Sequence, residues 1–200
     1  MNIDVINIVY IDDSPETELS RYLDSPFSND YKTKYEEIRF SPAEGYRSLL
    51  SNPKVREANI ILIDSLLFEN RSIASGTFTG EEFMFVLRRI FPFIETIIIS
   101  QNDLPPNFPF VKKHSYSSPM KAPEYYDQEL KPAIERAIEN IGRMRFLASM
   151  VQDNVSWDAY LKDKVLRTLD GYDEYDDLTK EDLDSIIESF RIIQEALDGD

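Results

Sequence analysis

The chain has 200 residues and a formal net charge of −15, with 37 Asp and Glu residues against 22 Lys and Arg. It contains no Cys and a single His, His114, which excludes disulfides, thiol catalysis, Cys-ligated zinc and any multi-His metal site within one chain. No apolar run approaches the ~20 residues needed to cross a membrane, and residues 1–4 lack the basic start of a signal peptide. We therefore expect a cytoplasmic protein of one domain, or of one domain with an appendage.

The first apolar run predicts a buried strand that ends on a pair of acids. Residues 5–11 (VINIVYI) are rich in β-branched side chains and are followed by Asp12 and Asp13, as expected of a strand inside a parallel sheet. Ser14 and Pro15 come next, and they suit the N-cap and the first turn of a helix.

Further along the chain, apolar runs alternate with helical stretches in a way typical of a parallel α/β sheet. Residues 59–63 (NIILI) predict a second buried strand that ends on an acid, Asp64. The other predicted elements are a weaker strand near an edge at 34–40, helices at 41–50, 81–90 and 128–150, a strand at 96–99 that ends at Ser100, and a short fifth strand at 108–113. The predicted fold class is α/β, with a doubly wound, five-stranded parallel sheet of the flavodoxin-like kind.

The last fifty residues differ from the rest, with 15 acidic against 5 basic side chains. Two amphipathic stretches flank an acidic break at 170–177 and predict a helical hairpin. We therefore divide the chain into domains 1–150 and 151–200. An exposed apolar face around Trp157 and Phe190 is unusual, so we expect the extension to pack on itself, on the preceding helix, or on a second copy in a homodimer. Its charge opposes DNA binding, and it serves either solubility or a basic partner protein.

Polar side chains stand at four predicted strand ends, where sites in open parallel sheets form. They are Asp12 with Asp13, Asp64, Ser100 and Lys113. Three neighbouring acids repel one another, and bound Mg²⁺, which prefers oxygen ligands, is the usual resolution. A lysine and a serine hydroxyl would stabilise an incoming phosphoryl group, and a carboxylate can attack phosphorus. The pattern therefore favours phosphorylation of an aspartate.

These residues resemble a response-regulator receiver domain, the phosphorylated module of two-component signalling. The matching stretches span most of residues 1–150: IVYIDDSPE, SPAEGYRSLL, ANIILIDSLL, GEEFMFVLRRI, TIIIS and FVKK. The resemblance implies a role for each of seven residues: Asp12 and Asp13 as ligands of Mg²⁺, Asp64 as phosphoacceptor and ligand, Leu66 as a ligand through its backbone carbonyl, Ser100 as the switch hydroxyl, Lys113 as the phosphate-contacting lysine, and Phe110 as the switch aromatic.

The chain departs from the family's pattern in three places. The glycine that the family places shortly after the phosphorylated aspartate corresponds to Gly80, sixteen residues after Asp64, so the intervening loop is enlarged. Only twelve residues separate Ser100 from Lys113, which leaves little room for the family's fourth helix. His114 stands where the family has proline. The acids of the site are present, while the face used for switching is remodelled.

Several of these residues also have plain structural interpretations. Asp12 and Asp13 could simply cap the first helix, and Phe110 suits a core position. Serine is common at strand ends, as at position 100. Lys112 competes with Lys113 for contact with phosphate.

Three functions remain open. The first is a phosphorylated signalling switch, with a sensor histidine kinase or phosphotransfer protein upstream and a protein partner downstream. The second is a pseudo-receiver adaptor that works without phosphorylation. The third is a Mg²⁺-dependent phosphotransfer enzyme, for which no further catalytic acid or base is evident. The acids favour the first function, and the missing helix and proline favour the second. In the first, the chain would at most catalyse its own phosphorylation and dephosphorylation.

Overall fold

Five parallel strands form a single sheet at the centre of the molecule. The computed structural model describes residues 5–25, 32–68, 79–104, 109–156 and 158–170. In the sheet order β2-β1-β3-β4-β5, the strands are β1 (Ile6–Asp12), β2 (Thr33–Arg39), β3 (Ile60–Asp64), β4 (Glu95–Ser100) and β5 (Phe110–Lys112). All four neighbouring pairs are parallel. This is the strand order of the flavodoxin-like doubly wound fold, so the predicted fold class is confirmed.

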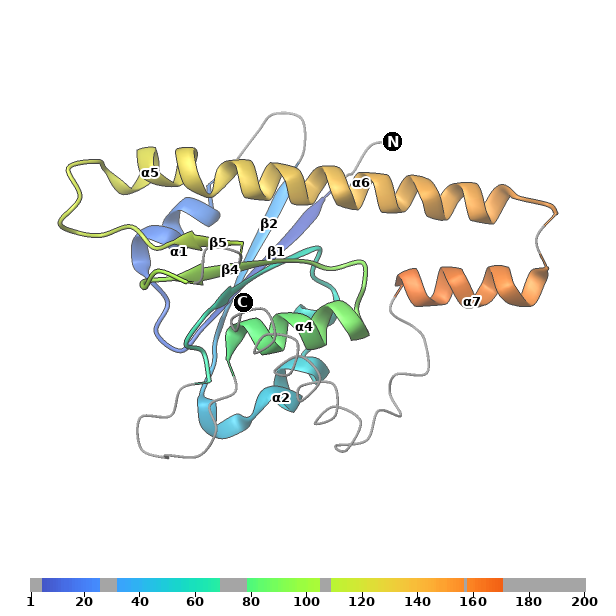
Figure 1. Cartoon of the computed structure of the whole chain (residues 1–200), viewed down its shortest axis with the longest axis horizontal. Coiled ribbons are helices and arrows are strands. Elements are labelled where there is room, and N and C mark those ends of the chain that lie inside the picture. The colour runs from blue at the N-terminus through green and yellow to red at the C-terminus, as the bar shows by residue number, and fades with distance from the viewer. Residues whose placement is uncertain (1–4, 26–31, 69–78, 105–108, 157, 171–200) are drawn as a thin grey trace, which may run out of the picture.

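Helices cover both faces of this sheet (Figure 1). On one face lie α1 (Thr17–Leu23), α5 (Ala122–Glu129) and α6 (Lys131–Asp153), and on the other α2 (Tyr46–Ser51), α3 (Pro53–Arg56) and α4 (Gly80–Ile90). A short 3₁₀ turn (Pro42–Glu44) precedes α2, and α7 (Ala159–Asp170) follows α6.

Each face of the sheet has its own apolar core. Because side chains alternate along a strand, Val9 and Ile11 point into the core under α2 and α4, whereas Ile8 and Tyr10 point into the core under α1 and α5. The central strand β3 is buried along its whole length, as expected of a parallel strand covered on both faces. In β2 half-buried and exposed positions mix, which fits its place at the edge.

The connection between β4 and β5 lacks a helix in its described part. Residues 101–104 and 109 are not helical, and the residues between them lie outside the described ranges. The expected loss of the family's fourth helix agrees with this part of the structure. Phe110 is half-buried there and packs against the core under α4.

The long helix expected at 128–150 is divided into α5 and α6. The division falls at Leu130, just before the Lys131-Pro132 pair. Proline has no N–H to donate to the preceding turn, so the helical hydrogen bonding is interrupted there. Helix α6 then continues to Asp153, through the domain boundary expected at 150.

The C-terminal helices extend away from the sheet. Figure 1 shows α6 projecting beyond the strands and α7 running back beside it. Phe146 and Met150 on α6 are 57% and 55% exposed, and Tyr160 on α7 is 76% exposed. The second helix of the expected hairpin lies outside the described residues. Among the helices that the structure describes, none combines the length and the apolar character that a membrane span needs.

Candidate functional site

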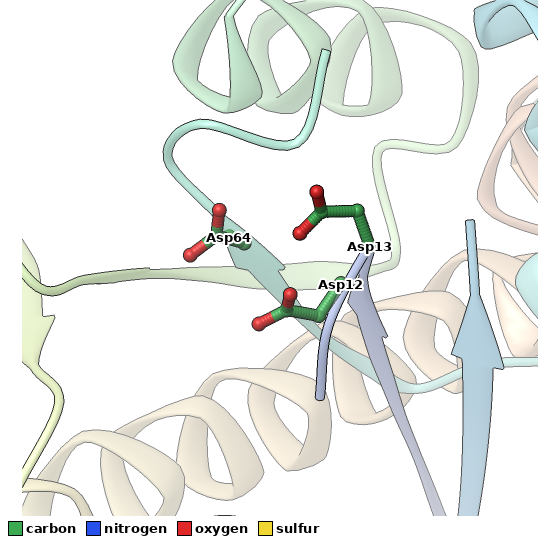
Figure 2. A group of neighbouring side chains, drawn as sticks. All are labelled: Asp12, Asp13 and Asp64. Carbon is green, nitrogen blue, oxygen red and sulfur yellow. The ribbon is translucent and has the colours of Figure 1, made fainter. Parts of the chain in front are cut away.

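Three aspartates meet at the carboxyl ends of β1 and β3. Asp12 ends β1, Asp13 follows it, and Asp64 ends β3. One carboxylate oxygen from each lies within 4.8 Å of the others, and Figure 2 shows the three carboxyl groups turned toward a common space. They line a pocket of about 220 Å³ together with Ser14, Leu66, Gln101 and Lys113. Parallel strands place their carboxyl ends at one edge of the sheet, which is why residues 52 positions apart converge here.

Lys113 supplies the positive charge of this pocket. Its Nζ lies 2.7 Å from Asp12 Oδ2 and 2.6 Å from Asp64 Oδ1. The residue is 8% exposed, so both ion pairs are shielded from water. Lys112 instead points to the surface and pairs with Asp103 at 2.7 Å. Of the two lysines that compete for the site, the structure therefore brings Lys113 into the pocket.

The pKa shifts of the three aspartates show how burial and the neighbouring charges act against one another. Burial alone would raise the pKa of Asp12, but hydrogen bonds from Lys113 and Tyr10 outweigh burial and hold that pKa below its ordinary value. Burial, and then the neighbouring Asp12, raise the pKa of Asp13. Burial also raises the pKa of Asp64 and outweighs the attraction of Lys113. Negative charge on Asp13 and Asp64 is thus only partly compensated within the pocket.

Asp12 is fixed more firmly than its neighbours. It is 1% exposed, and its Oδ1 accepts the backbone N–H of Ser14 at 2.8 Å. Its Oδ2 accepts both the Tyr10 hydroxyl and Lys113 Nζ. Tyr10 is not among the site residues predicted from the sequence. The available signal was a polar hydroxyl in an otherwise aliphatic strand, two positions before Asp12 and so on the same face of the sheet.

Asp64 is held by the loop that follows it. The backbone N–H of Leu66 donates to Asp64 Oδ2 at 3.0 Å, and the Ser65 hydroxyl donates to Glu81 Oε1 at 2.7 Å. The N–H of Gly80 donates to the Ser65 carbonyl at 3.0 Å. A capping box at Thr79 starts α4 directly beside this point. The N-terminus of α4 therefore anchors the phosphoacceptor candidate despite the enlarged loop.

Gly80 is required by a close approach of two backbones. A Cβ at this position would lie 2.2 Å from the carbonyl oxygen of Asp64. We expect Gly80→Ala to lower the free energy of unfolding by about 3 kcal/mol, since a side chain forced into a packed site displaces backbone, and to weaken Mg²⁺ binding by moving Asp64. Urea unfolding and calorimetric titration measure the two effects.

Gly45→Ala is the matched control for this substitution. Gly45 has φ 69° and nothing within 4 Å of an added Cβ, so the change costs backbone conformational energy alone. It should leave the affinity for Mg²⁺ unchanged. A Gly80→Ala chain with unaltered stability and Mg²⁺ affinity would show that the close approach to Asp64 does not constrain the site.

The three remaining residues to which the resemblance gives a role lie in different surroundings. Ser100 is 1% exposed, and its hydroxyl oxygen accepts the N–H of Asn102 at 3.1 Å, so it stabilises the turn after β4. Leu66 lines the pocket, and the role of its carbonyl as a ligand stays a prediction. Phe110, on β5, is half-buried and packs against the core, and its switching role likewise stays a prediction.

The donor set suits a hard divalent cation. All three converging groups are carboxylates, and Mg²⁺ prefers oxygen ligands while keeping several waters. The partial exposure of Asp13 leaves room for those waters. Asp12 already accepts three hydrogen bonds, so Asp13 and Asp64 are the better candidates for direct ligation.

Asp13→Ala and Asp64→Ala are each expected to weaken Mg²⁺ binding by roughly tenfold or more, because each removes a charged oxygen ligand. Calorimetric titration of Mg²⁺ checks this. Asp103→Ala serves as the control, since Asp103 is exposed and pairs only with Lys112 among the ion pairs of the described residues. Equal Mg²⁺ affinity in all variants would place the cation elsewhere.

Comparison with known proteins gives likeness of fold. No protein-family model matches the chain, and no curated protein matches it. Among solved structures, the chain is similar to the RcsB response regulator of Salmonella typhimurium at 14% identity, covering 95% of this chain and 90% of that one with a TM-score of 0.41. It is also similar to a pilus assembly-related protein from Burkholderia pseudomallei at 14% identity, covering 66% and 88% with a TM-score of 0.40. Likenesses this distant carry no argument about function, which must come from the site.

The fold and the site together resemble those of a receiver domain. The sheet has the order 2-1-3-4-5, three aspartates cluster at its carboxyl edge, and a buried lysine from the end of β5 bridges two of them. Beyond this domain the chain has the exposed C-terminal part of α6 and the α7 that contacts α6.

Proposed function

We propose that this chain is a signalling switch: Asp64 is phosphorylated in a Mg²⁺-dependent reaction, and the signal passes on through protein–protein contacts. The observation that carries the proposal is the group formed by Asp13, Asp64 and Lys113 in one pocket. Such a pocket offers a nucleophile, metal ligands and a cation for the transferred group. A sensor histidine kinase or phosphotransfer protein would then act upstream, and a protein partner downstream.

The chemistry follows from the positions of the groups. A carboxylate oxygen of Asp64 attacks phosphorus, the bond from phosphorus to the donor's leaving group breaks, and that group departs with the electron pair. The product is an acyl phosphate on Asp64. Lys113 lies 2.6 Å from the attacking carboxylate, where its charge can stabilise an oxygen of the transferred group. Bound Mg²⁺ would supply further charge neutralisation on the phosphoryl oxygens.

Asp12 has a supporting role in this scheme. Its carboxylate accepts hydrogen bonds from Ser14, Tyr10 and Lys113, so one of its roles is to orient the lysine. The pair Asp12–Lys113 is almost wholly buried, with side chains 1% and 6% exposed. Such shielding strengthens the hydrogen bond between them and restricts where Lys113 Nζ can lie.

A second candidate is the adaptor that works without phosphorylation. The described part of the β4–β5 connection has no helix, and Ser100 is engaged by Asn102. Both observations weaken the link between a phosphoryl group and the far side of the domain. Under this alternative the pocket has no role in signalling, and the exposed apolar residues of α6 and α7 bind the partner protein.

Incubation with acetyl phosphate separates the two functions. The switch gains the mass of one phosphoryl group in the presence of Mg²⁺ and loses the gain when the metal is chelated. The adaptor gains none under either condition. Intact-mass spectrometry of the full chain measures the outcome directly.

A further inference from the structure

Tyr10 carries a buried hydroxyl next to the site. The residue is 0% exposed, and its hydroxyl donates to Asp12 Oδ2. Burial raises the pKa of this hydroxyl, and the nearby backbone N–H of Glu16, in the segment between β1 and α1, acts in the opposite direction. The hydroxyl proton is donated to Asp12, and the hydroxyl oxygen lies beside the segment that leads into α1.

Tyr126 makes an equivalent connection from α5. It is also 0% exposed, and its hydroxyl donates to Glu16 Oε2 at 3.0 Å. Its oxygen accepts the backbone N–H of His114 at 3.1 Å. His114 directly follows Lys113 in the sequence. A proline here would have no N–H to donate, so this hydrogen bond depends on the departure from the family's pattern.

Together these contacts close a ring around the end of the sheet. Lys113 Nζ completes it by donating to Asp12 Oδ2 at 2.7 Å. The ring runs through Asp12, Tyr10, Glu16, Tyr126, His114 and Lys113. It joins β1, the start of α1, α5 and the end of β5, and buried networks of this kind strengthen and orient their members jointly.

The Glu16 backbone carbonyl accepts the N–H of Ser20 at the start of α1 at 2.9 Å, whereas the Glu16 side chain has one hydrogen-bond partner among the described residues. Its other carboxylate oxygen, Oε1, is buried and has no hydrogen-bond partner among the described residues. The same is true of His114 Nδ1. The Tyr126 hydroxyl is the side-chain partner that the structure gives the Glu16 carboxylate. Loss of that hydroxyl would therefore free the Glu16 side chain and loosen the segment that contacts Tyr10.

We propose that Tyr10 and Tyr126 are positioning residues, whose hydroxyls hold Asp12 and the Lys113 backbone in the arrangement needed for phosphoryl transfer. The inference rests on the proposed function. Tyr→Phe substitution isolates the hydroxyls, because phenylalanine retains the ring that fills the core. A role in packing alone predicts little effect of either substitution on the rate of phosphorylation.

The test compares Tyr10→Phe, Tyr126→Phe, the double variant and the control Tyr22→Phe. Tyr22 also donates its hydroxyl to a carboxylate, that of Asp127 at 2.9 Å, but it lies outside the ring. At saturating Mg²⁺ we expect each single variant to take up phosphate from acetyl phosphate about tenfold more slowly, since misplaced groups cost rate. The double variant should also be about tenfold slower, since both hydroxyls act through one network. Tyr22→Phe should match wild type.

Amide hydrogen exchange gives a second measurement that does not need phosphorylation. Breaking the ring at either tyrosine should speed exchange at both the Glu16 and the His114 amides, while Tyr22→Phe changes neither. Exchange that rises only beside the substituted tyrosine, or single rates equal to wild type, or rate losses that multiply in the double variant, would each overturn the inference. A wild-type chain that takes up no phosphate would refute the proposed function, and amide exchange would still decide whether the ring exists.

Discussion

Asp64→Asn is expected to take up no phosphate under conditions in which the wild-type chain gains one phosphoryl group. The substitution replaces a charged carboxylate with a neutral amide of nearly the same shape, so the packing around Leu66 and Gly80 is kept while the nucleophile is lost. Intact-mass spectrometry after incubation with acetyl phosphate and Mg²⁺ provides the measurement. The expected effect is complete loss, which makes this the largest change the account predicts.

Asp103→Asn controls for the removal of one surface carboxylate. Asp103 is 83% exposed at its side chain and pairs with Lys112, outside the pocket, so its phosphate uptake should equal that of wild type. An undiminished mass gain in Asp64→Asn would transfer the role of phosphoacceptor to another residue, and Asp13, the exposed aspartate of the pocket, would be the first alternative to test.

Lys113→Ala is expected to lower the free energy of unfolding at neutral pH by about 3 kcal/mol. Removing one partner of a buried ion pair leaves the other charge unpaired, and here two carboxylates, Asp12 and Asp64, lose their cation together. Urea unfolding measures the loss. The matched control is Lys112→Ala, whose exposed pair with Asp103 should contribute no more than about 0.5 kcal/mol.

The pH dependence of this loss has a definite sign. In wild type, Lys113 helps to hold the pKa of Asp12 below its ordinary value, so this contribution to stability is present above the unfolded pKa and is lost as the pH falls through the folded one. Without Lys113, burial raises the pKa of the same carboxyl, and the variant gains stability on protonation. The difference between the two chains should therefore shrink as the pH falls toward about 4, the ordinary pKa of an aspartate. A difference that is constant with pH would mean that the loss comes from packing.

The sheet and the convergence of the acids could be predicted from the sequence for a geometric reason. Runs such as 59–63 are apolar throughout, which few structures other than a covered parallel strand accommodate, and each ended on a polar residue. Once the strands were predicted parallel, Asp12, Asp13 and Asp64 had to meet at one edge. Their clustering within 4.8 Å follows from the fold class.

Other parts of the site depended on information that lies outside local patterns. Whether Lys112 or Lys113 enters the pocket depends on the register of β5. That strand has only three residues, too few to show an alternation of buried and exposed side chains. The hydroxyl contacts of Tyr126 with Glu16 and His114 join segments far apart in the chain. The break between α5 and α6 had a local signal in Pro132, which the apolar periodicity of the longer stretch masked.

Borohydride reduction of the phosphorylated chain identifies the residue that carries the phosphoryl group. Reduction converts an aspartyl phosphate into homoserine, and peptide mass spectrometry then locates the altered residue. We expect homoserine at position 64, and none when Mg²⁺ is chelated during phosphorylation. Homoserine at another aspartate, or a phosphate that resists borohydride because it is held on a serine, would contradict it.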